Sequence, residues 1–354
     1  MRALIASFIL WTSLWVSSAF AASNTLYGVP NFHLMYPSNT LHEMVLGSTC
    51  LSLPGSPLEL SCNPAFLATE EKRQVRANLA LNDRVVEVNK YRLLLEEEDT
   101  FGLVNGLLKE KEPLIANAAI SLWYQRDWWA IGVVPMRAGY ASFFRNSAYP
   151  EIAGHVFAER EIFAKAGLSL ASDPRVRLGL QARYNERDFF RKQFALLDAV
   201  TDNNLIRIEK QKALYLEPGL VYAFDDQARN TLSATVTNVA VYQSGSHQPV
   251  RPLFDLGFAT APNFADGKLK TSTHFTNNPE VNDPFQLFRA GVVYDFDQVA
   301  SISGSIAKTE LGLGVNGRIH SLILGVAYKT TEVYMDEWQS ARVSTWLAEL
   351  GLIF

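Results

Sequence analysis

The sequence lacks most of the features that usually reveal an activity. After Val16, no apolar stretch approaches the roughly 20 residues that a membrane-spanning helix requires, which excludes an α-helical membrane domain. The net charge is only −4 and the basic residues are scattered, so we expect no nucleic-acid partner. The sequence also contains no phosphate-binding loop, dinucleotide fingerprint or cluster of metal ligands. We therefore expect neither a cofactor nor a metal ion.

The six histidines are too scattered to indicate a catalytic site. His155 and Glu159 share one face of a predicted strand, but Ser169 lies too far along that strand to complete a triad. The remaining histidines mostly lack a neighbouring carboxylate and serine: His33, His42, His247, His274 and His320. We expect no catalytic residues and no enzyme activity.

The first 22 residues resemble an export signal. Met1 and Arg2 form a short positive region, an apolar run covers residues 3–16, and small residues at 19–22 fit a cleavage site. The alternative is a membrane anchor, for which about fourteen apolar residues are short of the roughly 20 needed. We therefore predict that residues 1–22 are removed on export.

The chain has only two cysteines, Cys50 and Cys62. In an exported protein, an even number of nearby cysteines favours a disulfide. Two buried free thiols are the alternative, and the lack of a second pair of ligands argues against zinc. We predict a disulfide that closes a small loop.

From Arg73 onward, short segments alternate apolar and polar residues, which indicates strands with two different faces. In residues 155–171 only Arg160 breaks the alternation. A soluble sandwich and a membrane barrel both produce this pattern. Strands of ten or more residues, aromatic residues near the strand ends and an alternation of short and long connections favour the barrel.

We predict fourteen strands and an all-β transmembrane antiparallel barrel over residues 71–354. The predicted strands cover residues 73–82, 116–125, 128–144, 155–171, 175–187, 212–224, 230–242, 251–260, 267–276, 286–296, 298–307, 309–315, 318–330 and 341–354. The short turns include Arg126-Asp127, Ser172-Asp173-Pro174 and Asn316-Gly317, and only the connection near Lys308 breaks the alternation of short and long. An even strand number places both termini in the periplasm.

The last predicted strand ends in an aromatic residue. Trp346, Leu350, Leu352 and Phe354 share one face, and a terminal aromatic of this kind resembles the signal by which the assembly machinery of the bacterial outer membrane recognises barrels. We therefore expect export to the outer membrane of a Gram-negative cell, with membrane lipids and the barrel assembly machinery as partners.

A family resemblance rests on residues just before the first strand. Leu53-Pro54-Gly55-Ser56, followed by Asn63-Pro64-Ala65, resembles the Asn-Pro-Ala motif of FadL-type proteins, fourteen-stranded outer-membrane transporters of long-chain fatty acids and other hydrophobic compounds. TraF-like conjugation proteins and PorV-type secretion proteins share it. The resemblance implies that residues 23–70 form a hatch inside the barrel, although the chain is shorter than typical members.

Charged residues at inward positions are expected to line the lumen: Glu159, Glu161, Lys165, Arg177, Arg183, Glu217 and Arg289. Because charges of both signs share a confined space, they can pair and hold the barrel together. The alternative is a selective ladder of charges for a solute.

Two long connections, residues 84–112 and 188–211, are predicted to be partly helical. Apolar residues among charges in 84–112 fit one or two amphipathic helices. Such a helix could cap the lumen mouth, contact lipid, capture a ligand or simply cover the barrel.

The resemblance implies passive transport of hydrophobic or amphiphilic small molecules. One alternative is a structural component of a conjugation or secretion system. A second alternative is an outer-membrane enzyme.

Overall fold

The computed structural model describes residues 39–54, 58–70, 72–99, 101–102, 105–106, 114–145, 151–195, 208–246, 252–262, 268–278, 284–297, 299–334 and 340–354. The predicted export signal lies outside these residues. None of the helices within the described ranges is long and apolar enough to cross a membrane, a finding that does not concern membrane-spanning strands.

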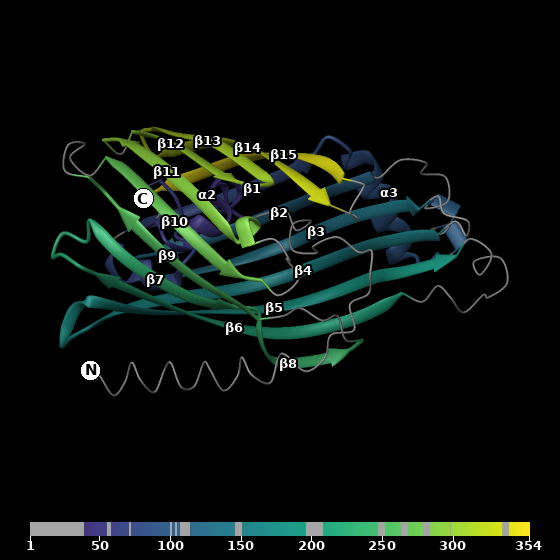
Figure 1. Cartoon of the computed structure of the whole chain (residues 1–354), viewed down its shortest axis with the longest axis horizontal. Helices are drawn as coiled ribbons and strands as arrows, with labels where there is room; N and C mark the ends of the chain where they lie inside the picture. The colour runs from purple at the N-terminus through teal and green to yellow at the C-terminus, as the bar shows by residue number, and fades with distance from the viewer. Residues whose placement is uncertain are drawn as a thin grey trace.

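The described chain consists mostly of antiparallel strands (Figure 1). The strands are β1 (Arg73–Asn82), β2 (Leu114–Arg126), β3 (Trp129–Arg145), β4 (Glu151–Leu170), β5 (Asp173–Ala195), β6 (Glu209–Ala223), β7 (Asn230–Thr237), β8 (Val239–Gly245), β9 (Leu253–Thr260), β10 (Leu269–Asn277), β11 (Phe288–Phe296), β12 (Ala300–Ala307), β13 (Glu310–Ile319), β14 (Leu322–Tyr334) and β15 (Ser340–Ile353). The helical elements are α2 (Leu41–Leu46), η2 (Gly47–Leu51), η3 (Pro64–Thr69), α3 (Val85–Glu96) and η5 (Pro284–Leu287).

The strands close into a barrel. Neighbouring strands pair antiparallel around the sheet, β5 pairs with β6, and β1 pairs with β15. β7 and β8 both pair with β6 and follow one course that is interrupted at Asn238, so together they count as one strand. The result is the predicted fourteen-stranded transmembrane barrel, which confirms the fold class.

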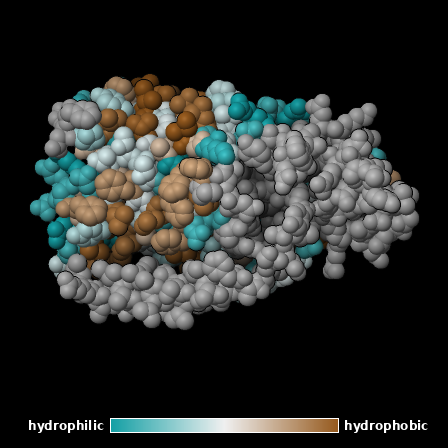
Figure 2. All heavy atoms as spheres, viewed as in Figure 1, coloured by the Kyte–Doolittle hydropathy of each residue, from teal (hydrophilic) through white to brown (hydrophobic). Residues whose placement is uncertain are grey.

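Each strand presents one face to the lumen and one to the outside. On β13, the outward Leu311, Leu313 and Val315 are exposed, whereas Gly312 and Asn316 are buried inside. Apolar side chains form a band over the short strands, bordered by hydrophilic residues (Figure 2). This band matches the surface that a membrane barrel presents to lipid.

Aromatic pairs mark the two edges of the band. At the end of the barrel with short turns, called the turn end, the pairs are Tyr124–Trp129, Tyr222–Phe224 and Tyr294–Phe296. At the opposite or loop end, they are Phe275–Phe288 and Tyr328–Trp346. Aromatic girdles at both interfaces are expected where a barrel crosses a bilayer.

The strands on one side of the barrel are much longer than those on the other side (Figure 1). β4 and β5 have 20 and 23 residues, whereas β9 and β12 have 8 each. Because a tilted strand crosses a bilayer in about 9–11 residues, the long strands extend beyond it. Arg160 is exposed on the outer face of β4 where this extension begins, which explains the one break in the predicted alternation.

The connection predicted over residues 188–211 is therefore partly wrong. Residues 188–195 continue β5 as a strand rather than beginning a helix, and residues 196–207 lie outside the described residues. In this segment Phe189 and Phe190, on opposite faces, are both buried. Because both faces are covered, the polarity of the segment does not alternate.

The helix predicted within residues 84–112 is α3, and it covers the outer face of the long strands, chiefly β2, β3 and β4. Val88 packs against Ala116, Ala118 and Ala138, and Tyr91 stacks on Tyr140 with ring centroids 3.8 Å apart. Strand register places these four wall residues on the outward face. Among the roles considered for this segment, α3 is thus a covering helix.

The turn predicted at Asn316-Gly317 is wrong. Both residues lie inside β13, and the turn falls at His320 and Ser321. The side chain of Asn316 points inward and donates a hydrogen bond to Glu59 Oε1 at 2.8 Å. An inward polar residue beside glycine therefore resembles a turn in the sequence although it is part of a strand.

Candidate functional site

Residues 39–54 and 58–70, here called the plug, lie inside the barrel. α2 packs against β12–β15, η2 against β7 and β9–β11, and η3 against β4–β6. The Cys50–Cys62 disulfide, confirmed by the structure, joins η2 to the segment before η3. The plug thus contacts nearly the whole circumference of the barrel.

The Asn63-Pro64-Ala65 motif begins η3. The Asn63 side-chain oxygen accepts a hydrogen bond from Ala65 N at 3.0 Å, and Pro64 occupies the first turn, where its missing N–H costs nothing. The Asn63 amide donates to the carbonyls of Leu51 at 3.1 Å and Leu220 at 3.4 Å. The motif therefore connects two parts of the plug to β6.

Three glycines form the surface on which this motif rests. Gly167, Gly179 and Gly219 lie directly opposite one another on β4, β5 and β6. A Cβ at any of them would overlap atoms of Asn63, Pro64, Ala65 or the plug backbone that follows. We name these three residues the glycine seat, because only glycine lets the wall approach the plug so closely.

The other half of the plug touches the wall in the same way. A Cβ at Gly257, Gly291 or Gly312 would overlap Ser52, Thr49 or the Val45 carbonyl, respectively. The Ser305 hydroxyl donates to the Val45 carbonyl at 2.5 Å. On this side the plug and wall are in direct contact.

The predicted lumen residues Glu159, Glu161, Arg183 and Glu217 meet in one ion-pair network. Arg183 Nη1 lies 3.1 Å from Glu161 Oε2, and its Nη2 lies 2.5 Å from Glu217 Oε1. Arg137 Nη1 lies 2.5 Å from Glu159 Oε1, and Arg187 also pairs with Glu159. We call this the wall network.

Sequence reasoning missed Arg137 and Arg187. A β-bulge between Val134 and Arg137 shifts the register, so Arg137 points inward although simple alternation places it outward. Arg187 is the last residue of the strand predicted over residues 175–187, whereas β5 continues to Ala195. A local sequence signal for the bulge is Pro135, which is unfavourable inside a regular ladder.

The wall network also forms hydrogen bonds with the plug and with Asn238, the residue between β7 and β8. Arg137 Nη2 donates to Asn39 Oδ1 at 2.5 Å. At the break, Arg183 Nη2 donates to Asn238 Oδ1 at 2.8 Å, and Asn238 N donates to Glu217 Oε1 at 3.0 Å. Asn238 has a φ of 60°, a left-handed conformation that asparagine tolerates better than most residues.

The remaining predicted lumen residues lie apart from this network. Lys165 donates to the Ser61 carbonyl of the plug at 3.0 Å. Arg289 pairs with Glu310, which also lies 2.7 Å from Lys329. Arg177 lies half-buried near the turn end of β5 and forms no ion pair with a described residue.

The expectation that the remaining histidines mostly lack a neighbouring carboxylate and serine does not hold for His274. Its Nδ1 lies 2.8 Å from Ser52 Oγ, and its Nε2 lies 3.0 Å from Asp255 Oδ1. All three side chains are buried, and Gly257 packs against Ser52 Oγ so closely that no Cβ fits between them. The three side chains form a polar link between Ser52 of the plug and the two wall residues Asp255 and His274.

The residues of the predicted assembly signal lie on the lipid-facing surface. Trp346, Leu350, Leu352 and Phe354 are all exposed on the outward side.

Among the described residues no group of three or more His, Cys, Asp and Glu side chains could hold a metal ion.

A closed fourteen-stranded antiparallel barrel with a plug inside it defines the chain as a transmembrane β-barrel. No protein-family model matches the chain, and no curated protein matches its sequence. Its structure is similar to the TodX deltaS2S3 mutant monoaromatic hydrocarbon channel, at 10% identity and a TM-score of 0.52 over 90% of this chain and 99% of that one. It is also similar to the Ralstonia pickettii toluene transporter TbuX, at 10% identity and a TM-score of 0.51 over 89% and 98% of the two chains. At this identity, the similarity establishes the fold alone, a closed barrel of fourteen antiparallel strands.

Proposed function

We propose that this protein carries hydrophobic or amphiphilic small molecules passively across the outer membrane. The observation that carries the proposal is the plug seated inside a fourteen-stranded barrel, an architecture whose matched structures are named as a monoaromatic hydrocarbon channel and a toluene transporter. The proposal assigns no catalytic step to the chain.

The interior favours such solutes over hydrated ions. The wall network contains three arginines and three glutamates, all paired with one another. Because each charge is neutralised by a partner, the network offers no unbalanced ring of charge of the kind that selects ions. We assign its charged residues to holding the wall and the plug together.

We further propose that residues 23–70 act as a hatch that keeps water and polar solutes out of the lumen. The contacts of the plug with β4–β7 and β9–β15 support this role. The residues of this segment before Asn39 lie outside the described residues.

Saturable binding tests the proposal. The purified protein, folded in detergent, is titrated with radiolabelled toluene and with oleate, and binding is measured by equilibrium dialysis against protein-free micelles. We expect saturable binding of at least one of them and none of labelled sucrose. Absence of saturable binding for both hydrophobic compounds would reject the transport function.

A further inference from the structure

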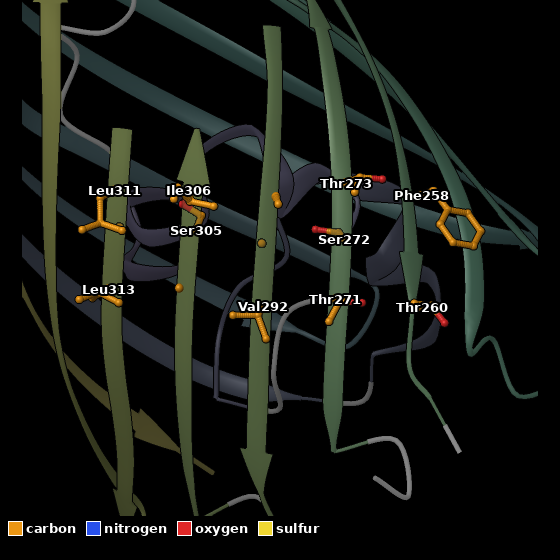
Figure 3. A pocket seen from close by; sticks show the side chains of 14 residues that line it. Phe258, Thr260, Thr271, Ser272, Thr273, Val292, Ser305, Ile306, Leu311 and Leu313 are labelled. Carbon is orange, nitrogen blue, oxygen red and sulfur yellow. The ribbon is translucent and has the colours of Figure 1, made fainter. Parts of the chain in front are cut away.

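The lipid-facing surface of the short strands β9–β13 contains a depression with a cavity volume of about 590 Å³ (Figure 3). Its rim consists of larger outward side chains, and its floor consists of small ones. The rim residues are Phe258, Val292, Ile306, Leu311 and Leu313. The floor residues are Thr271, Thr273, Ala290 and Gly304.

Strand pairing shows that the depression faces the membrane rather than the lumen. Thr273 pairs with the outward Phe258 and with Ala290, and Gly304 pairs with Val292 and Leu313. The inward neighbours of these residues, such as Gly291 and Ser305, contact the plug on the other side of the wall.

The depression lies between the two aromatic edges of the lipid band. On β10 and β11, Phe275 and Phe288 pair above it with ring centroids 5.1 Å apart. Tyr294 and Phe296 pair below it at 4.7 Å. Because these pairs mark the interfaces, the depression lies at the depth of the lipid acyl chains.

Among the described residues, no neighbouring atom requires glycine at position 304. A Cβ there would meet its nearest neighbours, the Gly312 carbonyl oxygen and Leu313 Cδ2, at 3.5 Å, which is ordinary van der Waals contact. Glycines of the seat differ, because the plug backbone fills the space of their Cβ atoms. Glycine inside a strand is unfavourable and often marks a bulge, a bend, or a place where a ligand or another backbone approaches closely.

We propose that this depression is a binding site for one acyl chain of a membrane lipid. An acyl chain at this depth would contact aliphatic, phenylalanine and threonine side chains. The small residues Gly304 and Ala290 leave the space that it would occupy. An unfilled depression would leave these groups without van der Waals partners on one side. A flexible chain fills it without conformational change in the wall. The bound lipid would stabilise β10–β12 from the membrane side, while the plug packs against the same strands from inside the barrel.

Lipid retention tests this site. Protein stripped of lipid is reconstituted into palmitoyl-oleoyl phosphatidylethanolamine vesicles, extracted in mild detergent and examined by native mass spectrometry. We expect the wild type to keep one lipid per barrel and Gly304→Leu to lose most of it. Ala164→Leu is the matched control, because Ala164 lies on the outward face of β4, diametrically opposite β12 in the ring, and should keep the lipid.

Ala290→Leu, which fills the same depression from β11, provides a second variant. Absence of retained lipid in the wild type would overturn the proposal, as would equal retention in wild type and both filled variants. If the wild type forms dimers that Gly304→Leu dissociates, the depression binds a second copy of the chain instead, and the proposal is wrong. None of these outcomes depends on transport.

Discussion

Gly179 of β5 lies against the backbone of Ala65 so closely that a Cβ on Gly179 would overlap Ala65 N. Gly167 and Gly219, its lateral neighbours on β4 and β6, meet the same short segment of the plug. This contact joins the Asn-Pro-Ala motif to the barrel wall without any side chain between them.

Substitution of the glycine seat should loosen the plug. Gly179→Ala places a methyl group where plug backbone lies, and overpacking of this kind costs about 1–3 kcal/mol. We expect faster proteolysis of the plug and a lower unfolding midpoint in urea. Gly317→Ala is the control, since no atom lies within 4 Å of its Cβ position, and equal effects of the two variants would contradict the seat.

The disulfide should stabilise the plug more than the barrel. Cys50 and Cys62 are separated by 12 residues, and closing a loop of this order is worth about 2–4 kcal/mol. The Cys50→Ser/Cys62→Ser double variant should expose the plug to protease while the barrel remains resistant to denaturation by detergent at room temperature. A plug equally protected in both proteins would show that the disulfide does not hold it.

Removal of Arg183 should damage the wall network. Arg183→Met leaves Glu161 and Glu217 with fewer partners, and breaking a buried ion pair in this way costs about 3–5 kcal/mol. Adding Glu217→Gln should recover part of the loss in urea unfolding, because one uncompensated charge is then removed. Arg175→Met, in an exposed pair with Asp173, serves as the control and should have little effect.

The polar link between plug and wall predicts coupled variants. Ser52→Ala and His274→Ala each remove one side of the hydrogen bond between Ser52 Oγ and His274 Nδ1. We expect each to increase plug proteolysis and the double variant to add little, because both remove the same contact. Full additivity would mean that the two residues act independently.

The turn between β6 and β7 has a pH-dependent contribution to stability. Hydrogen bonds from Arg229 N and Asn230 N, at 2.9 and 3.0 Å, lower the pKa of Asp225 below its ordinary value. A depressed carboxyl pKa stabilises the fold above the ordinary pKa, and this stability is lost as pH falls through the lowered pKa. Wild type should therefore exceed Asp225→Asn in stability at neutral pH, and the difference should vanish in strong acid. A difference independent of pH would refute this role.

Local alternation predicted the strands well because membrane and lumen impose opposite polarity on the two faces of every strand. β1 runs over the predicted residues 73–82, and the other strands lie close to their predicted positions. The disulfide also followed from residue type and spacing. These features depend on neighbouring residues and on the solvent around each face.

Contacts between distant residues could not be predicted in this way. Ser52, Asp255 and His274 meet only because the plug enters the barrel, and the inward direction of Arg137 depends on a bulge. The glycine seat leaves a weak signal, since three inward glycines occur at the same level of adjacent strands. Without strand pairing, that alignment is not visible in the sequence.

Uptake by cells tests the transport proposal most directly. Gram-negative cells lacking their own channels for hydrophobic compounds are compared with and without this protein, using labelled toluene, oleate and sucrose at matched concentrations. We predict faster initial uptake of toluene or oleate and unchanged entry of sucrose. Faster sucrose entry, or hydrophobic uptake equal to that of cells without the protein, would contradict a plugged barrel that carries hydrophobic compounds.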